Sequence, residues 1–208
     1  MITPIILAAG KSSRMGEQHK LLLDFGGKTL VERVIENVAR SNLATPILVY
    51  SDPRIRDLCC SYGISMLENE NSDLGMSSSM KLGLSHVPLK SDGVIFVFGD
   101  MPLVSSGILN QMLAAFEAVP DPQGSILAPY YRGHRRLPNI YGRWFFPKIF
   151  QIKGDIGPRF ILRSHMDRVY KLDFLEETPF FDVDCPEDYQ KVLTYWRESR
   201  KENCYDSD

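Results

Sequence analysis

The sequence predicts a single α/β domain in which helices cover both faces of a mostly parallel sheet. Short apolar runs alternate with amphipathic segments along the chain, which is the order expected of repeated β–α units. The run at residues 2–7 is apolar except for Thr3, as in a strand buried on both faces, and the clearest later run, residues 92–98, is followed by Gly99 and Asp100. Ligands of such sheets bind beyond the carboxyl ends of the strands, so the polar residues found there are the first functional candidates.

The expected elements follow one another with short interruptions. Strands are predicted at residues 2–7, 46–50, 64–67, 92–98, 125–129 and 167–172, with a short extended piece at 180–183. Helices are predicted at residues 29–41, 53–62, 76–86, 104–118, 144–151, 158–165 and 186–200. We therefore expect one domain over residues 1–200, followed by a polar, disordered tail at residues 201–208.

The composition excludes several classes of protein. The 208 residues carry 24 Lys+Arg against 26 Asp+Glu, a formal charge of −2 that argues against a general nucleic-acid binder. No apolar run in the sequence approaches the roughly 20 residues that a transmembrane helix needs, so no membrane partner is expected. The four cysteines show no CxxC spacing, which favours a reduced, cytoplasmic protein without a structural zinc site.

The loop after the first strand, LAAGKSSRMGEQHK (residues 7–20), has the properties of a phosphate-binding loop. Its small residues let the backbone approach a ligand, and successive backbone N–H groups can form an anion-binding concavity. Arg14 and Lys20 add two cations that suit a triphosphate. The loop matches neither GxGxxG nor GxxxxGK[ST], which argues against a nicotinamide oxidoreductase and a P-loop protein. The alternative is an ordinary loop with surface cations.

Five ordered segments of the chain resemble known sequence motifs. The loop resembles LAAGxSxRMGxxK, NSDLGMSSSMKLGL (71–84) resembles G-M-x-x-S-(hydrophobic)-x-x-G-L, and VFGDMPL (97–103) resembles a strand ending in G-D-M-P. KGDIGPRFIL (153–162) resembles G-D-x-G-x-R, and FDVDCPEDY (181–189) resembles D-I-D-T-P-E-D. Together these motifs resemble the signatures of nucleotidyltransferases that attach a nucleotide to the molybdenum cofactor, and the resemblance to that family spans residues 4–189. It implies a three-layer αβα fold with a Rossmann-like sheet of the nucleotidyltransferase (glycosyltransferase-A-like) type.

The last two segments are similar to those of the molybdenum cofactor cytidylyltransferases. Ala9 stands where guanylyltransferase relatives have glycine, and Asp182 and Asp184 stand where they have asparagine, which favours CTP over GTP. One segment departs from the family pattern, because R-G-H-P is replaced by Arg-Arg-Leu-Pro at residues 135–138. This departure leaves the acceptor open, although Arg136 could serve an anionic substrate.

The resemblance implies roles for individual residues. Arg14, Lys20 and Asp100 are the expected catalytic residues, and Asp100 with Asp184 is the expected ligand set for Mg²⁺, with Mn²⁺ as an alternative. A carboxylate at a strand end is well placed to bind such a metal beside nucleotide phosphates, although an aspartate there can also simply cap a helix. We expect Asp182 and Asp184 to point to opposite sides of their extended segment, so that only one of them reaches the metal: Asp184 by the family pattern, with Asp182 as the alternative.

The remaining expected site residues bind the two substrates. The nucleotide-binding residues are Leu7, Ala8, Ala9, Gly10, Arg14, Lys20, Gly75, Ser77 and Ser79. The expected acceptor-binding residues are Asp155, Arg159 and Arg136. The alternatives are that the serines cap a helix start and that Asp155 and Arg159 form a surface ion pair.

The reaction that the resemblance implies is transfer of CMP from CTP to the terminal phosphate of a molybdopterin-type cofactor, with release of pyrophosphate. The product would pass to a molybdenum hydroxylase apoprotein. Three alternatives stay open: a sugar or alcohol phosphate as the acceptor, GTP as the nucleotide, and a non-catalytic protein that carries the molybdenum cofactor.

Overall fold

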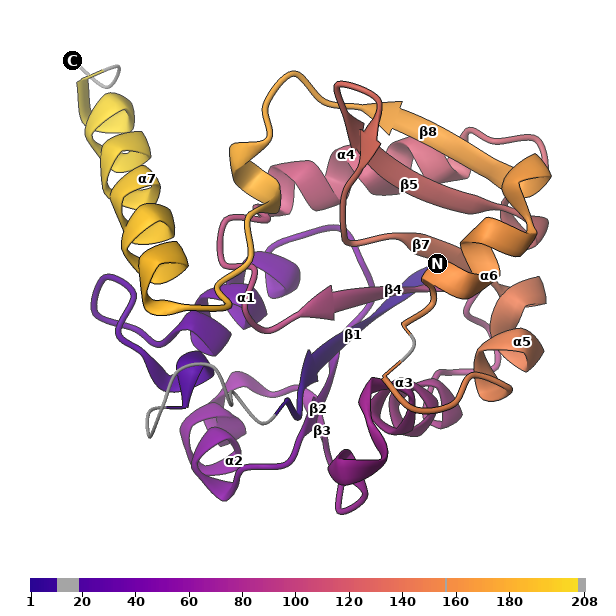
Figure 1. Ribbon diagram of the computed structural model, residues 1–208, viewed down its shortest axis with the longest axis horizontal. Helices are drawn as coiled ribbons and strands as arrows, with labels where there is room; N and C mark the ends of the chain where they lie inside the picture. The colour runs from indigo at the N-terminus through magenta and orange to yellow at the C-terminus, as the bar shows by residue number, and fades with distance from the viewer. Residues whose placement is uncertain (11–18, 156, 206–208) are drawn as a thin grey trace.

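The computed structural model describes the chain except for residues 11–18, 156 and 206–208. Its centre is one sheet with the strand order β3-β2-β1-β4-β7-β5-β6, in which β8 pairs with β5 (Figure 1). The strands are β1 (Ile2–Ala8), β2 (Ile47–Tyr50), β3 (Ser65–Glu68), β4 (Gly93–Phe98), β5 (Ile126–Tyr131), β6 (His134–Arg135), β7 (Ile140–Gly142) and β8 (Val169–Asp173).

The sheet is mostly parallel, as the sequence predicts. β1 pairs in parallel with both β2 and β4, β2 with β3, and β5 with β8. The exceptions are the short strands β6 and β7, which pair antiparallel with β5, and β7 also with β4. These two strands were not predicted, because two or three residues are too few to show the alternation typical of a strand.

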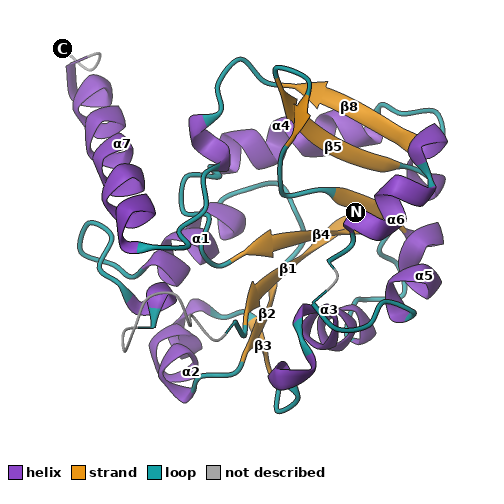
Figure 2. Cartoon of the chain, viewed as in Figure 1, coloured by secondary structure: helices purple, strands orange, loops and turns teal. Residues whose placement is uncertain are grey.

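Helices cover both faces of the sheet, so the predicted three-layer αβα architecture is confirmed (Figure 2). Val34 of α1 and Leu109 of α4 pack in the core on one face, while Met80 of α3 and Ile161 of α6 pack on the other. Helices α1 to α6 each fall within a segment predicted as helical, whereas α7 begins where predicted but continues past residue 200 into the expected tail. The helices are α1 (Leu30–Ala39), α2 (Pro53–Cys59), α3 (Met76–Ser85), α4 (Ser106–Glu117), α5 (Phe146–Phe150), α6 (Arg159–Ser164) and α7 (Pro186–Tyr205).

Local sequence signals explain where two of these helices begin. The Thr29 side chain accepts a hydrogen bond from the Glu32 amide, and the Glu32 side chain accepts one from the Thr29 amide, so α1 starts with a capping box. Asp52 caps α2, whose first residue is Pro53. A 3₁₀ turn at Cys60–Tyr62 then completes the helix that was predicted over residues 53–62.

The C-terminal helix α7 stands beside the sheet rather than over one of its faces (Figure 1). Val192 and Leu193 of α7 pack with Phe25, Leu30 and Val183 in a small separate core. The helix runs to Tyr205, and the domain boundary at residue 200 stays a prediction. Across the described residues, no helix is both long enough and apolar enough to cross a membrane.

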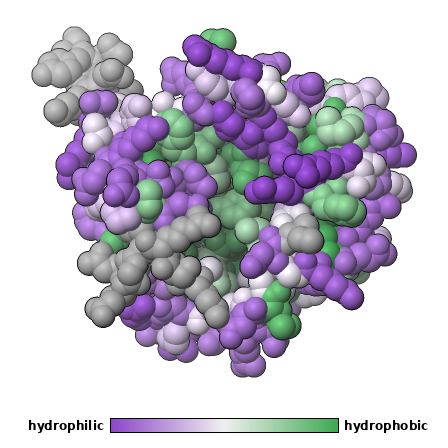
Figure 3. Space-filling model, in the orientation of Figure 1, coloured by the Kyte–Doolittle hydropathy of each residue, from purple (hydrophilic) through white to green (hydrophobic). Residues whose placement is uncertain are grey.

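The carboxyl ends of β1 and β4 meet at one edge of the sheet. Leu7 pairs with Phe98, and beyond this pair the Gly99 amide donates a hydrogen bond to the Leu7 carbonyl at 3.0 Å. The loops that follow both strands therefore leave the sheet side by side. The face seen in Figure 3 is hollowed here, with hydrophobic residues at the bottom of the hollow and hydrophilic residues around it.

Candidate active site

The hollow is a cavity of about 680 Å³ at the carboxyl ends of the strands. Most of the residues expected to bind substrates or metal line this one cavity. They are Leu7, Ala9, Gly10, Lys20, Gly75, Ser79, Asp100, Asp155, Arg159, Asp182 and Asp184. These eleven residues, which are spread over most of the sequence, are therefore brought to one place by the fold.

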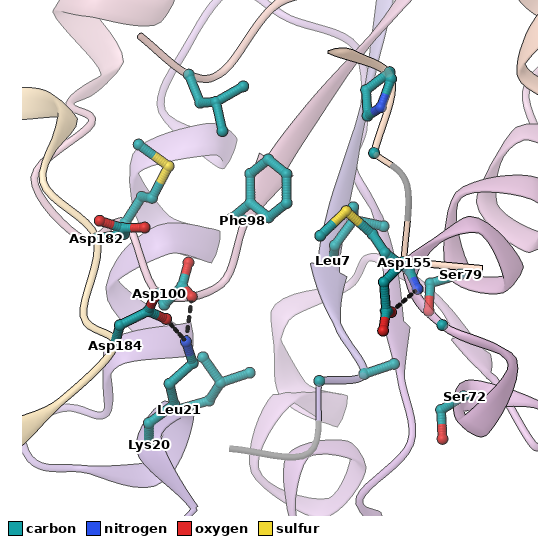
Figure 4. A pocket seen from close by; sticks show the side chains of 18 of the residues that line it. Leu7, Lys20, Leu21, Ser72, Ser79, Phe98, Asp100, Asp155, Asp182 and Asp184 are labelled. Atoms are coloured by element: carbon teal, nitrogen blue, oxygen red, sulfur yellow. Dashed lines mark hydrogen bonds and ion pairs between the residues drawn. The ribbon is translucent and has the colours of Figure 1, made fainter. Parts of the chain in front are cut away.

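The most concentrated charge in the cavity is a cluster of Lys20, Asp100 and Asp184, whose side chains point toward one another in Figure 4. The Lys20 ammonium lies 2.5 Å from Asp100 Oδ2 and 3.0 Å from Asp184 Oδ1. The side chains of Lys20 and Asp100 are only 14% and 16% exposed, whereas that of Asp184 is 44% exposed. The Lys20–Asp100 pair is thus the sheltered part of the cluster, and Asp184 is the part that faces solvent.

Burial and charge act in opposite directions within this cluster. Burial disfavours the ammonium form of Lys20, but the Asp100 and Asp184 carboxylates outweigh it and raise the pKa of Lys20. Burial raises the pKa of Asp100, with a smaller contribution from Asp182 and Asp184, and the opposing effect of Lys20 does not cancel it. Lys20 is therefore held in its charged form, while burial opposes the ionisation of Asp100 and Lys20 favours it.

The expectation that Asp182 and Asp184 face opposite sides is wrong. Both carboxylates line the cavity, while Val183 between them is fully buried. Side chains two residues apart in an extended segment lie on the same side, and those next to each other lie on opposite sides. The predicted extended piece at residues 180–183 is itself only partly regular, since it begins within the 3₁₀ turn Thr178–Phe180.

Two sets of hydrogen bonds hold this carboxylate segment against the end of β4. The Val183 amide donates to the Asp100 carbonyl at 3.0 Å. Asp188, in the first turn of α7, accepts hydrogen bonds from the amides of Asp184 and Cys185 at 3.2 and 3.1 Å. Asp188 thereby fixes the backbone that carries Asp184. The hydrogen bond from the Cys185 thiol contributes most to lowering the pKa of Asp188, and the two amide hydrogen bonds lower that pKa further.

The opposite wall of the cavity is formed where α3 begins against the loop before α6. Asp155 Oδ1 accepts a hydrogen bond from the Met76 amide at 3.0 Å, and the Gly154 carbonyl accepts one from the Ser77 amide at 3.1 Å. Gly75 has φ +90° and ψ 178°, a conformation that essentially only glycine adopts. A Cβ at Gly75 would lie 2.5 Å from the Gly154 carbonyl carbon and 2.6 Å from Asp155 Oδ1, so this wall requires glycine there.

The remaining expected nucleotide-binding residues differ in their exposure to the cavity. Ser79 lines it, and its hydroxyl accepts a hydrogen bond from Asn69 Nδ2 at 2.8 Å. Ser77 is 4% exposed and Ala8 is fully buried, and neither side chain lines the cavity. Arg14 lies outside the described residues, so its expected role stays a prediction.

The segment at residues 135–138 differs from what the sequence suggested. Arg136 forms an ion pair with Glu177 and does not line the cavity, whereas its neighbours Arg135 and Leu137 do. Sequence reasoning also missed Phe98 and Met101, which supply part of the apolar bottom of the cavity. Their position directly before and after the Gly99-Asp100 pair is the signal that could have identified them.

The donor set fits a hard divalent cation that is held jointly with a nucleotide. Within the described residues, no group of three or more His, Cys, Asp or Glu side chains is arranged to hold a metal by itself. Mg²⁺, however, commonly takes only one or two protein carboxylates and completes its shell with waters and substrate phosphates. Asp100 and Asp184 contact the same Lys20 ammonium, so their oxygens converge on one point as such a cation requires.

Comparison with known proteins shows which proteins this chain resembles. The chain is 29% identical over 189 residues to the molybdenum cofactor guanylyltransferase of Vibrio cholerae serotype O1, covering 88% of this chain and 87% of that protein. The fold matches a nucleotidyl transferase from Methanothermobacter thermautotroptrophicus (Mth528) with a TM-score of 0.83 at 19% identity, covering 96% of this chain and 99% of that one. It also matches Rv0371c of Mycobacterium tuberculosis H37Rv in complex with manganese, with a TM-score of 0.78 at 22% identity, covering 93% and 98%.

The family model for the MobA-like NTP transferase domain matches residues 4–169. This match covers β1 to the beginning of β8 and includes the cavity residues from Leu7 to Arg159. The structural matches place the same fold among nucleotidyltransferases. The chain therefore belongs to the family of MobA-like NTP transferase domains and is a nucleotidyltransferase.

Proposed function

We propose that this nucleotidyltransferase transfers CMP from CTP to the terminal phosphate of a molybdopterin-type cofactor and releases pyrophosphate. The observation that carries the proposal is the convergence of Lys20, Asp100 and Asp184 at the carboxyl ends of β1 and β4. A cation next to two carboxylates suits a triphosphate that arrives with a divalent metal. Mg²⁺ is the proposed metal, with Mn²⁺ as the alternative, held by Asp100 and Asp184 and with Asp182 beside them.

The chemistry needs no nucleophile from the protein. An oxygen of the acceptor phosphate attacks the α-phosphorus in line, the bond to the β-phosphate breaks, and pyrophosphate leaves with the electron pair. Catalysis by this chain would consist of positioning and of stabilising charge as it moves onto the leaving group. Among the described residues, Lys20 supplies positive charge on the nucleotide side of the cavity. We propose Arg14 as a second cation beside it, because of the loop motif. A bound divalent cation would supply charge neutralisation on the triphosphate.

The choice of CTP rests on two features of the chain. Ala9 places a methyl group at the cavity wall where guanylyltransferases, by resemblance, have glycine. Asp182 and Asp184 both line the cavity, in place of the asparagines of those relatives. GTP is the second candidate, because the relative that is 29% identical over most of the chain is named a guanylyltransferase.

The acceptor side of the cavity suits a molecule with both an apolar body and an anionic end. Phe98, Met101 and Leu137 provide apolar surface, and Arg135 and Arg159 provide positive charge. This combination supports a pterin that carries a phosphate, and a sugar or alcohol phosphate is the alternative acceptor. We propose that the modified cofactor is then delivered to a molybdenum hydroxylase apoprotein in the cytoplasm. A protein that only carries the cofactor would not need the Lys20–Asp100–Asp184 cluster.

The proposal is tested in two stages with the purified protein. Thermal shift with CTP, GTP, ATP and UTP, each with Mg²⁺, should give the largest increase in melting temperature with CTP, because a ligand that binds the native state stabilises it. Release of pyrophosphate from CTP should then depend on added molybdopterin. A larger shift with GTP would overturn the choice of nucleotide, and binding of molybdopterin without pyrophosphate release from either nucleotide would favour the carrier.

A further inference from the structure

The two neighbouring arginines of the altered segment have different surroundings. Arg135 is the last residue of β6 and pairs directly with Tyr130 of β5. Residues that face each other in an antiparallel pair lie on the same face of the sheet. Tyr130 belongs to the core that also contains Ile161 and Leu162 of α6, so Arg135 lies on the α6 side of the sheet. Adjacent strand residues point to opposite faces, which separates the Arg136 side chain from that of Arg135.

Arg136 is committed to a structural contact. Its guanidinium donates to Glu177, one residue before the 3₁₀ turn Thr178–Phe180 that leads to the aspartates of the cavity. This ion pair ties the hairpin of β5 and β6 to that turn. The tie explains why the second arginine is present without any role for it in ligand binding.

Arg135 differs from Arg136 in its place and its contacts. Each arginine has one buried nitrogen without a hydrogen-bond partner among the described residues, Nη1 of Arg135 and Nε of Arg136. Only Arg135 lines the cavity, and it forms no ion pair within the described residues, whereas Arg136 is paired with Glu177. A buried charged donor without a partner is costly, and the cost is removed when an anion arrives. The Tyr141 hydroxyl near it is uncharged, because burial raises the pKa of Tyr141 to about 12, although the Asn139 hydrogen bond and the Arg135 charge oppose this. Asn139 Nδ2 donates to that hydroxyl at 3.3 Å. Arg159, the first residue of α6, lines the same cavity.

We propose that Arg135, and not Arg136, binds the phosphate of the acceptor and makes the site specific for acceptors that carry a phosphomonoester. This inference rests on the proposed nucleotidyl transfer, because it assigns the positive charge on the acceptor side of that site. A guanidinium can hold two phosphate oxygens at once and so fixes the direction of the group that attacks the nucleotide. Arg135 is thus a specificity residue, and Arg159 is its partner on the same side of the cavity.

A purely structural role for Arg135 has a distinct signature. Asn139 Oδ1 is also buried and without a partner among the described residues, so a shift of either side chain could bring the two together. In that case, replacing Arg135 would lower the melting temperature and leave anion binding unchanged. The proposed role predicts the reverse, a loss of anion binding that exceeds any loss of stability.

The test is calorimetric titration of inorganic phosphate into the full chain, with and without saturating Mg²⁺ and nucleotide. R135Q should weaken phosphate binding at least tenfold, whereas R163Q, which removes the same charge from an exposed position on α6, should stay within twofold. R136Q should lower the melting temperature but also keep phosphate affinity within twofold. R135K, which keeps the charge without the planar fork, should fall between R135Q and the parent and guards against misfolding of R135Q.

The transfer assay then separates this inference from the proposed function. With molybdopterin as the acceptor, R135Q should raise the KM for the acceptor at least tenfold and leave the KM for the nucleotide unchanged. Equal phosphate affinity in R135Q and R163Q, or equal losses in R135Q and R136Q, would overturn the assignment. Failure of the parent protein to bind any nucleotide would overturn the proposed function, while the phosphate titration would still decide the role of Arg135.

Discussion

Replacing Lys20 by methionine separates the structural part of the charged cluster from its catalytic part. The variant removes two charge-assisted hydrogen bonds, of 2.5 Å to Asp100 and 3.0 Å to Asp184. The first contributes most to stability, because both of its side chains are sheltered, whereas the exposed Asp184 carboxylate is screened by solvent. Hydrogen bonds to charged groups contribute about 1.5–3 kcal/mol, so we expect a loss of about 2 kcal/mol. For a domain of this size that corresponds to a decrease in melting temperature of about 4–8 °C.

The pH dependence of the variant gives a second, independent measure. Burial already raises the pKa of Asp100, and removing Lys20 takes away the main opposing charge, so the folded-state pKa should rise further. A carboxyl whose pKa is raised on folding contributes stability below its unfolded pKa and loses it as pH rises through its folded pKa. The difference in free energy of unfolding between the parent and K20M should therefore be small near pH 4 and grow toward pH 7.

The assay combines thermal unfolding with steady-state kinetics in a double-mutant cycle with D100N. The double variant K20M/D100N should recover most of the stability lost in K20M, because it no longer contains an unpaired buried carboxylate. Its kcat/KM should nevertheless stay at least tenfold below that of the parent, which corresponds to a loss of about 1.4 kcal/mol of transition-state stabilisation. K90M, at an exposed position, is the control for loss of a lysine. If K20M keeps the melting temperature and turnover of the parent, Lys20 is part of neither the fold nor the reaction.

Three further variants test the walls of the cavity. D100A should abolish metal-dependent transfer while circular dichroism stays that of the folded parent, and near-normal turnover would remove Asp100 from the metal site. G75A should destabilise the domain by about 1–3 kcal/mol in chemical denaturation, because its Cβ would meet Gly154 and Asp155 and its φ of +90° strains any L-residue; unchanged stability would contradict this geometry. D188A should lower the free energy of unfolding by about 1 kcal/mol, because the amides of Asp184 and Cys185 lose their acceptor. It should also lower kcat several-fold by loosening Asp184, and an unchanged kcat would show that the position of Asp184 does not depend on Asp188.

The strands and helices that the sequence predicts share one physical property, a hydrophobic pattern long enough to show its period. β1 is buried along all seven of its residues and α1 buries one face, so both patterns can be read without the rest of the fold. β6 and β7 lack such a pattern, since they are held by pairing with β5 rather than by their own residues. Such short strands depend on tertiary context, and the antiparallel part of the sheet was for that reason not predicted.

The members of the site could be predicted more readily than their contacts. Strand ends and motif resemblance selected Lys20, Asp100 and Asp184. Along the chain, however, Lys20 is 80 positions from Asp100 and 164 positions from Asp184. The segment that carries Asp184 is held there by the hydrogen bond from the Val183 amide to the Asp100 carbonyl, which no local pattern encodes. The error over Asp182 and Asp184 had a different origin, since the two-residue period of an extended chain already places both on one side.

Arg135 and Arg136 show most directly why chemistry read from a sequence does not by itself assign a site. The two residues are neighbours with the same side chain, and nothing in the order Arg-Arg-Leu-Pro says which of them meets a ligand. The register with β5 decides it, because pairing with Tyr130 places Arg135 on the face toward α6 and leaves Arg136 for Glu177. A one-residue shift of that register would exchange the two roles. The specificity that we propose for the acceptor is therefore set by strand pairing as much as by the presence of arginine, and a deletion in the turn between β5 and β6 should disturb acceptor binding without changing any residue of the cavity.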